Sequence, residues 1–175
     1  MSIAGFFRIS ELLDVQIKDI TIHSNYIEVY VKKSKCDQLR EGHVVKIAET
    51  KSSTCPVFWL KKYLRVTNLE NHPESYLLCK FYKTRKSHRV DFCKNVTYDT
   101  MRKSFLMLIS KVFPGQCKQF GLHSLRSGGA SAAADNEVDE RLIGKHGRWK
   151  SKRCQERYIK DGNPKRLSVS KSLGI

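Results

Sequence analysis

Hydrophobic and β-branched residues follow a helical or an alternating spacing over most of this chain. Residues 3–15 carry apolar side chains at helical spacing, which predicts an amphipathic helix that begins almost at the first residue. Ile22, Tyr26–Val31 and His43–Ala48 are rich in β-branched residues and lie around the polar stretch 32–42. This pattern predicts a β-hairpin with a long basic loop.

Helical spacing returns after the hairpin. Ser53 or Thr54 can cap a helix that has Pro56 in its first turn and that continues to Leu64. We expect this helix to pack on the hairpin. Residues 68–89 are mixed in character and strongly basic towards their end, which predicts a short extended piece and a surface loop.

The second half of the chain is predicted to be helical. Apolar residues recur at helical spacing over residues 97–112, up to a Pro-Gly pair, and this indicates a helix that lines the core. Residues 122–158 are typical of three short helices with breaks at 135–136 and 144–147.

Together these elements predict an α+β fold, a mostly helical domain with a small antiparallel β-hairpin or three-stranded sheet on one edge. A chain of 175 residues is long enough to bury one core. We expect residues 1–161 to form one domain and residues 162–175 to form a C-terminal tail. No apolar run approaches the roughly 20 residues that span a bilayer, so the sequence predicts no membrane segment.

The charge of the chain favours a polyanionic partner. Lys and Arg number 33 against 17 Asp and Glu, a formal net charge of +16. Nucleic acid is the first interpretation, ahead of an anionic membrane and of a basic surface that only aids solubility. The six cysteines are scattered without a C-x-x-C pair, which indicates reduced intracellular thiols and predicts neither a metal site nor a cofactor.

Two pairs of residues near the C-terminal end suggest chemistry. His123 and Arg126 are three residues apart, so at the start of a helix they share one face and can meet one oxyanion beside free backbone N–H groups. Trp149 and Tyr158 are nine residues apart. Taken singly, each pair is more often a surface salt bridge or part of a core.

Two N-terminal features add to these pairs. Arg8 and Glu11 are three residues apart, which by itself indicates an intrahelical ion pair of little energetic value. The hairpin loop carries Lys32, Lys33 and Lys35, which in isolation indicate a solvated basic turn.

In this order the four features resemble the signature of the tyrosine recombinase, or phage integrase, family. The family pattern has Gly-x-Arg-x-Ser/Ala-Glu-Leu near one helix, a lysine in a β-hairpin, His-x-x-Arg, and His or Trp nine residues before Tyr. The resemblance covers nearly the whole chain, and its hairpin and Gly-Arg-Trp strings look closer to recombinases of eukaryotic mobile elements. The matching residues are Arg8, Glu11, Lys35, His123, Arg126, Trp149 and Tyr158.

The resemblance implies that Tyr158 is the nucleophile of DNA strand transfer. A tyrosine hydroxyl with a reference pKa of about 10 needs a group that takes its proton, and His123 is the candidate base. Charge develops on nonbridging phosphate oxygens, and the forked guanidiniums of Arg8 and Arg126 match that geometry.

Three further roles follow from the same resemblance. Lys35 would give a proton to the departing 5′ oxygen. Trp149 would donate its indole N–H to the phosphate, and Glu11 would orient the arginines. Lys32 or Lys33 could replace Lys35, and His146 could replace Trp149. We also expect DNA contacts from four basic residues, Lys32, Lys33, Arg148 and Lys150.

The sequence therefore predicts site-specific cleavage and rejoining of DNA through a 3′-phosphotyrosyl intermediate, that is, recombination or integration. The alternatives are a non-catalytic DNA-binding remnant of a mobile-element recombinase and a type IB topoisomerase-like enzyme. The expected partner is double-stranded DNA, with four copies of the chain acting together. In the family a helical clamp domain precedes the catalytic one, so this chain could be inactive alone. We expect an intracellular protein, nuclear in a eukaryote and cytoplasmic in a bacterium or phage.

Overall fold

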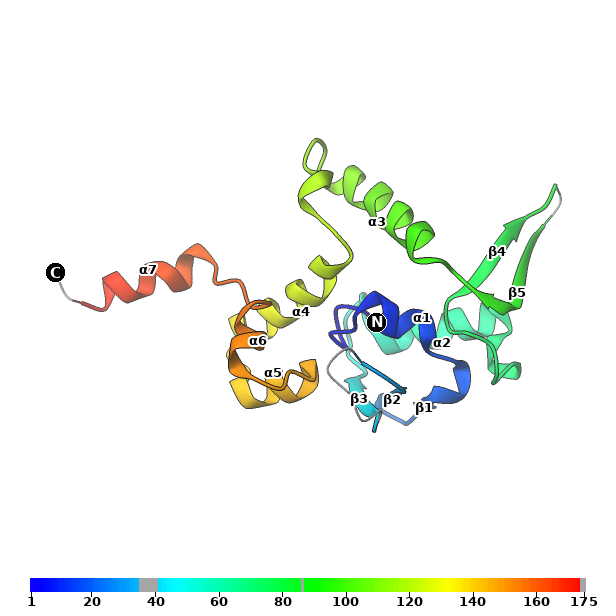
Figure 1. Ribbon diagram of the computed structural model, residues 1–175, viewed down its shortest axis with the longest axis horizontal. Coiled ribbons are helices and arrows are strands. Elements are labelled where there is room, and N and C mark those ends of the chain that lie inside the picture. Colours follow the sequence, from blue (N-terminus) through cyan, green and yellow to red (C-terminus); the bar gives the residue numbers. More distant parts are fainter. Residues whose placement is uncertain (35–40, 86, 174–175) are drawn as a thin grey trace.

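A computed structural model describes residues 1–34, 41–85 and 87–173, and its helices and strands are arranged as Figure 1 shows. The N-terminal half runs α1 (Ile9–Asp14), η1 (Ile17–Asp19), β1 (Ile20–Ile22), β2 (Tyr26–Val31), β3 (His43–Ala48), α2 (Pro56–Thr67) and η2 (Leu69–Asn71). The rest runs β4 (Cys79–Lys83), β5 (His88–Asn95), α3 (Tyr98–Val112), η3 (Cys117–Gln119), α4 (His123–Asp135), α5 (Glu140–Gly147), α6 (Lys152–Glu156) and α7 (Asn163–Lys171).

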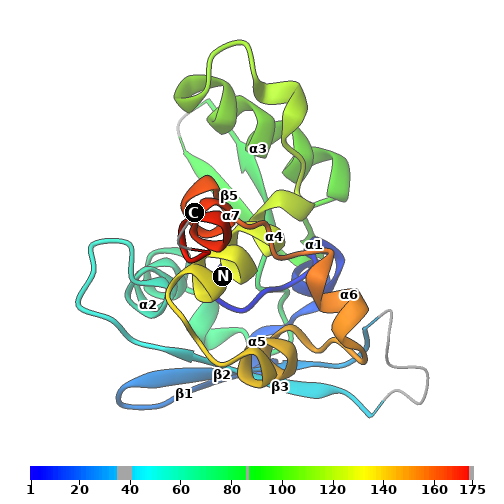
Figure 2. The ribbon, with the colours of Figure 1, turned by 90° about the vertical axis from the view of Figure 1, so that its left-hand side faces the viewer.

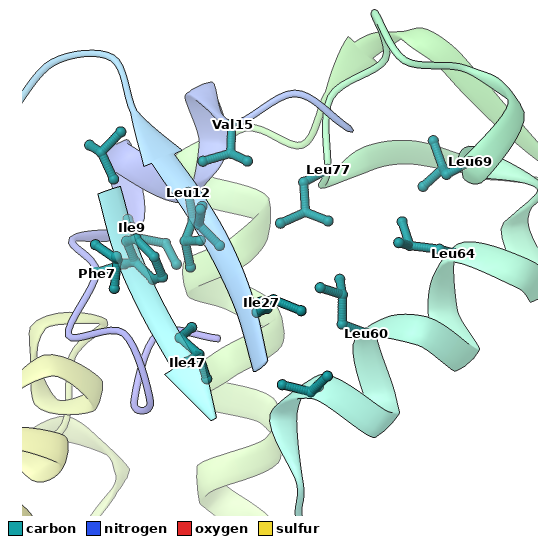
Figure 3. Close-up of a cluster of buried hydrophobic side chains, with 14 of the residues drawn as sticks. Phe7, Ile9, Leu12, Val15, Ile27, Ile47, Leu60, Leu64, Leu69 and Leu77 are labelled. Atoms are coloured by element: carbon teal, nitrogen blue, oxygen red, sulfur yellow. The ribbon is translucent and has the colours of Figure 1, made fainter. Parts of the chain in front are cut away.

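The predicted hairpin forms β2 and β3 of a three-stranded antiparallel sheet in the order β1-β2-β3, which confirms the α+β fold class. Val29 pairs with Ile20 on one side and with Val45 on the other. Alternate residues of β2 point to the core, so Ile27 and Val29 are fully buried. Figure 3 shows side chains of the sheet, α1 and α2 in one cluster, in which the sheet packs on α2 as expected.

The N-cap of α2 lies one residue after Thr54 and two after Ser53, the two predicted caps. Cys55 is the N-cap, and its sulfur accepts the backbone N–H of Phe58 at 3.4 Å, with Pro56 in the first turn as predicted. The prediction for residues 68–89 missed a second hairpin, in which β4 pairs with β5. Most side chains on these strands are exposed and many are charged, so no alternating apolar pattern marks them in the sequence.

The first predicted helix is shorter than expected, because only residues from Ile9 onwards are helical. Phe6 has a φ of 46°, a left-handed conformation that ends any helical run before it. The carbonyl oxygens of Gly5 and Phe6 accept hydrogen bonds from arginine side chains instead of from helix N–H groups. Residues 1–8 are thus a turned segment that is fixed by contacts with the distant C-terminal part.

The helix α3 has the predicted bounds but is not a core helix. None of its residues is buried, and only Met101 and Phe105 pack against the main core at its N-terminal part. Leu108 and Val112 are more than half exposed. Periodicity predicted the helix correctly, but it cannot distinguish a face that is covered from one that is not.

The last third has the three predicted helices before Tyr158. The break at 135–136 is confirmed, whereas residues 144–147 belong to α5, which ends at the left-handed Arg148 with a φ of 57°. The tail contains α7, which projects from one end of the molecule in Figure 1 and comes forward in Figure 2. Within the described ranges no helix has the length and apolarity to cross a bilayer.

Truncating Leu77 to alanine should cost about 2–5 kcal/mol of unfolding free energy, because its side chain is only 1% exposed within the main core and its removal leaves a cavity. Urea unfolding measures the change. Val66→Ala on α2, where the side chain is 79% exposed, is the control and should shift stability by less than about 0.5 kcal/mol. Equal unfolding midpoints for the two variants would contradict the described core.

Candidate active site

The start of α4 brings together the two residues of the His-x-x-Arg motif. His123 is the first residue of the helix and is exposed, whereas Arg126, one turn later on the same face, is fully buried. Arg126 donates to the carbonyl oxygens of Phe6 and Gly147, which come from opposite ends of the chain. A buried arginine therefore joins the N-terminal segment to the end of α5.

Tyr158 lies directly against these residues. It follows α6 and is half-buried, and its hydroxyl oxygen is 3.4 Å from Nε2 of His123. The guanidinium carbon of Arg126 lies 5.1 Å from the centre of the Tyr158 ring. The predicted nucleophile thus has the predicted base and one predicted phosphate-binding arginine as neighbours.

Trp149 completes this group as the nine-residue spacing predicted. Its ring centre is 5.1 Å from that of Tyr158 and 4.8 Å from the guanidinium carbon of Arg126. A Cβ on Gly147 would lie 1.9 Å from the indole ring, so only glycine leaves room for the ring in this place. The indole Nε1 and the Nε of Arg126 are buried donors without a hydrogen-bond partner among the described residues, and both suit an oxyanion.

Glu11 holds three arginines at one point. Its carboxylate oxygens are 2.8 Å from Arg8, 2.7 Å from Arg148 and 3.8 Å from Arg126, and its side chain is 3% exposed. The backbone N–H of Arg8 also donates to this carboxylate at 2.9 Å. Three guanidiniums around one carboxylate leave the cluster positively charged.

Burial sets the electrostatics of the cluster. Desolvation, followed by repulsion from Arg8, lowers the pKa of Arg126 to about 10, so the group still carries its charge at neutral pH. Desolvation also lowers the pKa of His146 below its ordinary value, which favours the neutral ring. The cationic character of the site therefore rests on the arginines.

His146 contacts the N-terminal segment, whereas Trp149 contacts Tyr158. Its Nε2 donates to the carbonyl oxygen of Ala4 at 2.8 Å, and its ring meets Phe6 edge to face at 4.7 Å. The sequence alone gave no sign of this contact, because residues 4 and 146 are at opposite ends of the chain. Trp149 is the residue that packs on Tyr158.

The predicted basic residues have different surroundings. Lys32 bonds to Asp19 at 2.9 Å and to Gln16 at 2.6 Å. Lys33 and Lys150 are exposed. Lys35 lies outside the described residues.

The expected DNA contact of Arg148 is wrong, because this side chain is buried. It is only 7% exposed, and it donates to Glu11 and to the carbonyl oxygens of Gly5, Phe6 and His146. A surface role fails because this guanidinium is turned inwards by the left-handed end of α5. Its position in the sequence, beside Trp149 and among other basic residues, gave no signal of burial.

Replacing Glu11 with glutamine should lower the free energy of unfolding by about 3–5 kcal/mol, because the buried arginines lose their only nearby carboxylate in the described cluster. Urea unfolding measures this, with the exposed Glu70→Gln as the control. Sodium sulfate should restore stability to the Glu11 variant beyond sodium chloride of equal ionic strength, since an oxyanion can bind the freed guanidiniums. Equal stability of both variants would refute the central role of Glu11.

Comparisons with known proteins agree on one family. The model of the phage integrase family matches residues 2–163. An integrase/recombinase xerD homolog of Selenomonas ruminantium is 29% identical over 167 residues, which are 93% of this chain and 46% of that protein.

Solved structures share the fold. XerA recombinase aligns with a TM-score of 0.69 at 16% identity, over 98% of this chain and 55% of that one. XerH site-specific recombinase bound to palindromic difH substrate, in a post-cleavage complex, aligns with a TM-score of 0.66 at 17% identity, over 98% of this chain and 42% of that one. The chain thus spans about half the length of the proteins it matches. With the family model matched from residue 2 to residue 163, the chain belongs to the phage integrase family of tyrosine recombinases.

Proposed function

We propose that this protein cleaves and rejoins double-stranded DNA at specific sites through a covalent bond between Tyr158 and a 3′ phosphate. The observation that carries the proposal is the position of the Tyr158 hydroxyl, 3.4 Å from His123 and beside Arg126 and Trp149. Family membership supports a recombinase in general. We assign the cleavage chemistry from the arrangement of these four side chains.

The scissile phosphate would bind between the arginines and the indole. Arg126 and Arg8 offset charge on the nonbridging oxygens, and Trp149 donates its N–H to one of them. Because Glu11 fixes these cations before DNA arrives, little reorganisation is needed in the transition state.

The covalent step exchanges one phosphoester for another. His123 accepts the phenolic proton, the Tyr158 oxygen bonds to phosphorus, and the bond from phosphorus to the 5′ oxygen breaks. The 5′ oxygen then takes a proton, which we assign to Lys35 by the family resemblance. Attack by a 5′ hydroxyl reverses the sequence and rejoins the strand, so bond energy is kept throughout.

The proposed partners are duplex DNA and further copies of the chain. XerH in the matched structure is bound to difH substrate, which supports DNA as the partner of this fold. We assign residues 1–161 to the catalytic domain and the tail from 162 to exchange between copies in a tetramer. In the tail, Lys165 bonds within its own chain to Asp135 at 3.4 Å and to the carbonyl oxygen of Ala134.

Tyr158→Phe should abolish covalent capture of nicked duplex DNA and leave DNA binding within about twofold of wild type, because it removes the nucleophilic oxygen and little else. Denaturing gel electrophoresis detects the adduct. Tyr98→Phe, at an exposed tyrosine of α3, is the matched control and should form the adduct normally. An adduct with the Tyr158 variant would reject this nucleophile, and binding without an adduct in the wild-type chain would favour the DNA-binding remnant.

Lys35→Ala should cleave ordinary DNA slowly and recover on a substrate with sulfur at the bridging 5′ position, because a thiolate leaves without a proton. Arg126→Lys should not recover on this substrate. Its defect is the loss of the guanidinium that places charge at the phosphate, and a better leaving group does not replace that charge. Single-turnover cleavage rates compare the two. Recovery of Lys33→Ala instead would move the acid to Lys33.

A further inference from the structure

The hairpin of β4 and β5 is an arm that extends from the body of the molecule. Figure 1 shows it at the opposite end from α7, with the active-site helices α4 and α6 between them. Its tip is closed by hydrogen bonds between Thr84 and Ser87, including one from the Ser87 N–H to the Thr84 hydroxyl at 2.9 Å. None of the side chains assigned to the catalytic site comes from this arm.

The base of the arm is tied to the helix that carries Glu11. The Asn95 side chain donates to the carbonyl oxygen of Leu13, in the last turn of α1, at 3.0 Å. Cys79 is fully buried, and the Phe92 ring stacks on His72 with 3.9 Å between ring centres. A base held in this way fixes the direction of the arm relative to the active site.

The arm is unusually basic. Residues 79–95 contain six Lys and Arg against a single acid, Asp91, although they are a small part of the chain. Lys80 is paired across the strands with Asp91, and its ammonium lies 5.1 Å from the Tyr82 ring. The cations nearer the tip, Lys83, Arg85 and Arg89, are exposed.

Exposed aromatic rings lie among these cations. Phe81 is 46% exposed and Tyr82 is 40% exposed, and they stand on opposite faces of β4 because successive strand residues alternate. Duplex DNA carries about one negative charge per 1.7 Å of its axis, and its major groove, about 12 Å wide, admits a two-stranded ribbon. A basic, aromatic ribbon of two strands fits this partner in charge and in shape.

We propose that the β4–β5 arm is a second contact for double-stranded DNA, which holds the duplex beside the segment bound at Tyr158. The proposal rests on the proposed function in one respect, that duplex DNA is the substrate. The arm supplies affinity through phosphate contacts, and its anchorage on α1 couples this grip to the position of Arg8 and Glu11.

The test compares two triple variants that remove equal charge. K83Q/R85Q/R89Q removes the exposed cations near the tip of the arm, and K51Q/K62Q/R65Q removes three exposed cations at and before α2. Fluorescence anisotropy with a 40-base-pair duplex of random sequence measures Kd from about 50 to 200 mM salt, the range in which phosphate contacts dominate. Thermal melts verify that both variants are folded.

The arm variant should bind at least about tenfold more weakly than the α2 variant at 100 mM salt, and its salt slope should fall by about 0.9 for each phosphate that is no longer neutralised. With saturating nicked duplex it should still form the Tyr158 adduct in wild-type yield. Equal weakening in both variants, or unchanged binding by the arm variant, would overturn the proposal and point to bulk charge or to another polyanion, such as RNA. Absence of the adduct in the wild-type chain would defeat the proposed catalysis, but the binding comparison would still decide the role of the arm.

Discussion

The structure depends on one buried carboxylate. Glu11 meets guanidiniums from the start of α1, from α4 and from the end of α5, three segments that are distant in the sequence. Like charges in a poorly solvated interior repel strongly, so these arginines can be neighbours only with an anion among them. The turned N-terminal segment follows from this constraint. Its carbonyl oxygens accept hydrogen bonds from the guanidinium N–H groups of Arg126 and Arg148 that do not bond to Glu11.

The same constraint prepares the site for chemistry. A single carboxylate does not neutralise three arginines, so the cluster keeps an excess of positive charge where a phosphate would bind. Burial strengthens the attraction between this charge and an anion, and it also raises the free energy that is needed to keep the charge away from water. The indole of Trp149 and Nε of Arg126, both buried without a protein partner among the described residues, fit this interpretation. Under the proposed function, this local cost in stability makes the binding of an oxyanion favourable.

Much of this arrangement could be predicted from the sequence, and the failures have physical causes. The spacing between His123, Arg126, Trp149 and Tyr158 predicted a cluster that the structure assembles. Local spacing could not show that Arg148 is turned inwards, because its partners other than the His146 carbonyl lie 137 residues or more away. Helical periodicity predicted the bounds of α3 and not its exposure, and the charged β4–β5 hairpin lacks the apolar alternation that marks strands.

The link between Glu11 and Arg148 also has a consequence for synthesis of the protein. These residues are 137 positions apart, so a growing chain carries Arg8 and Glu11 long before their partners have been translated. Contacts of such high sequence separation form late, after local helices and hairpins. Tyr158 follows α6, so a ribosome-bound fragment that ends before α6 already contains Arg8, Arg126 and Arg148 but not Tyr158. If Tyr158 is the nucleophile that we propose, such a fragment cannot cut DNA.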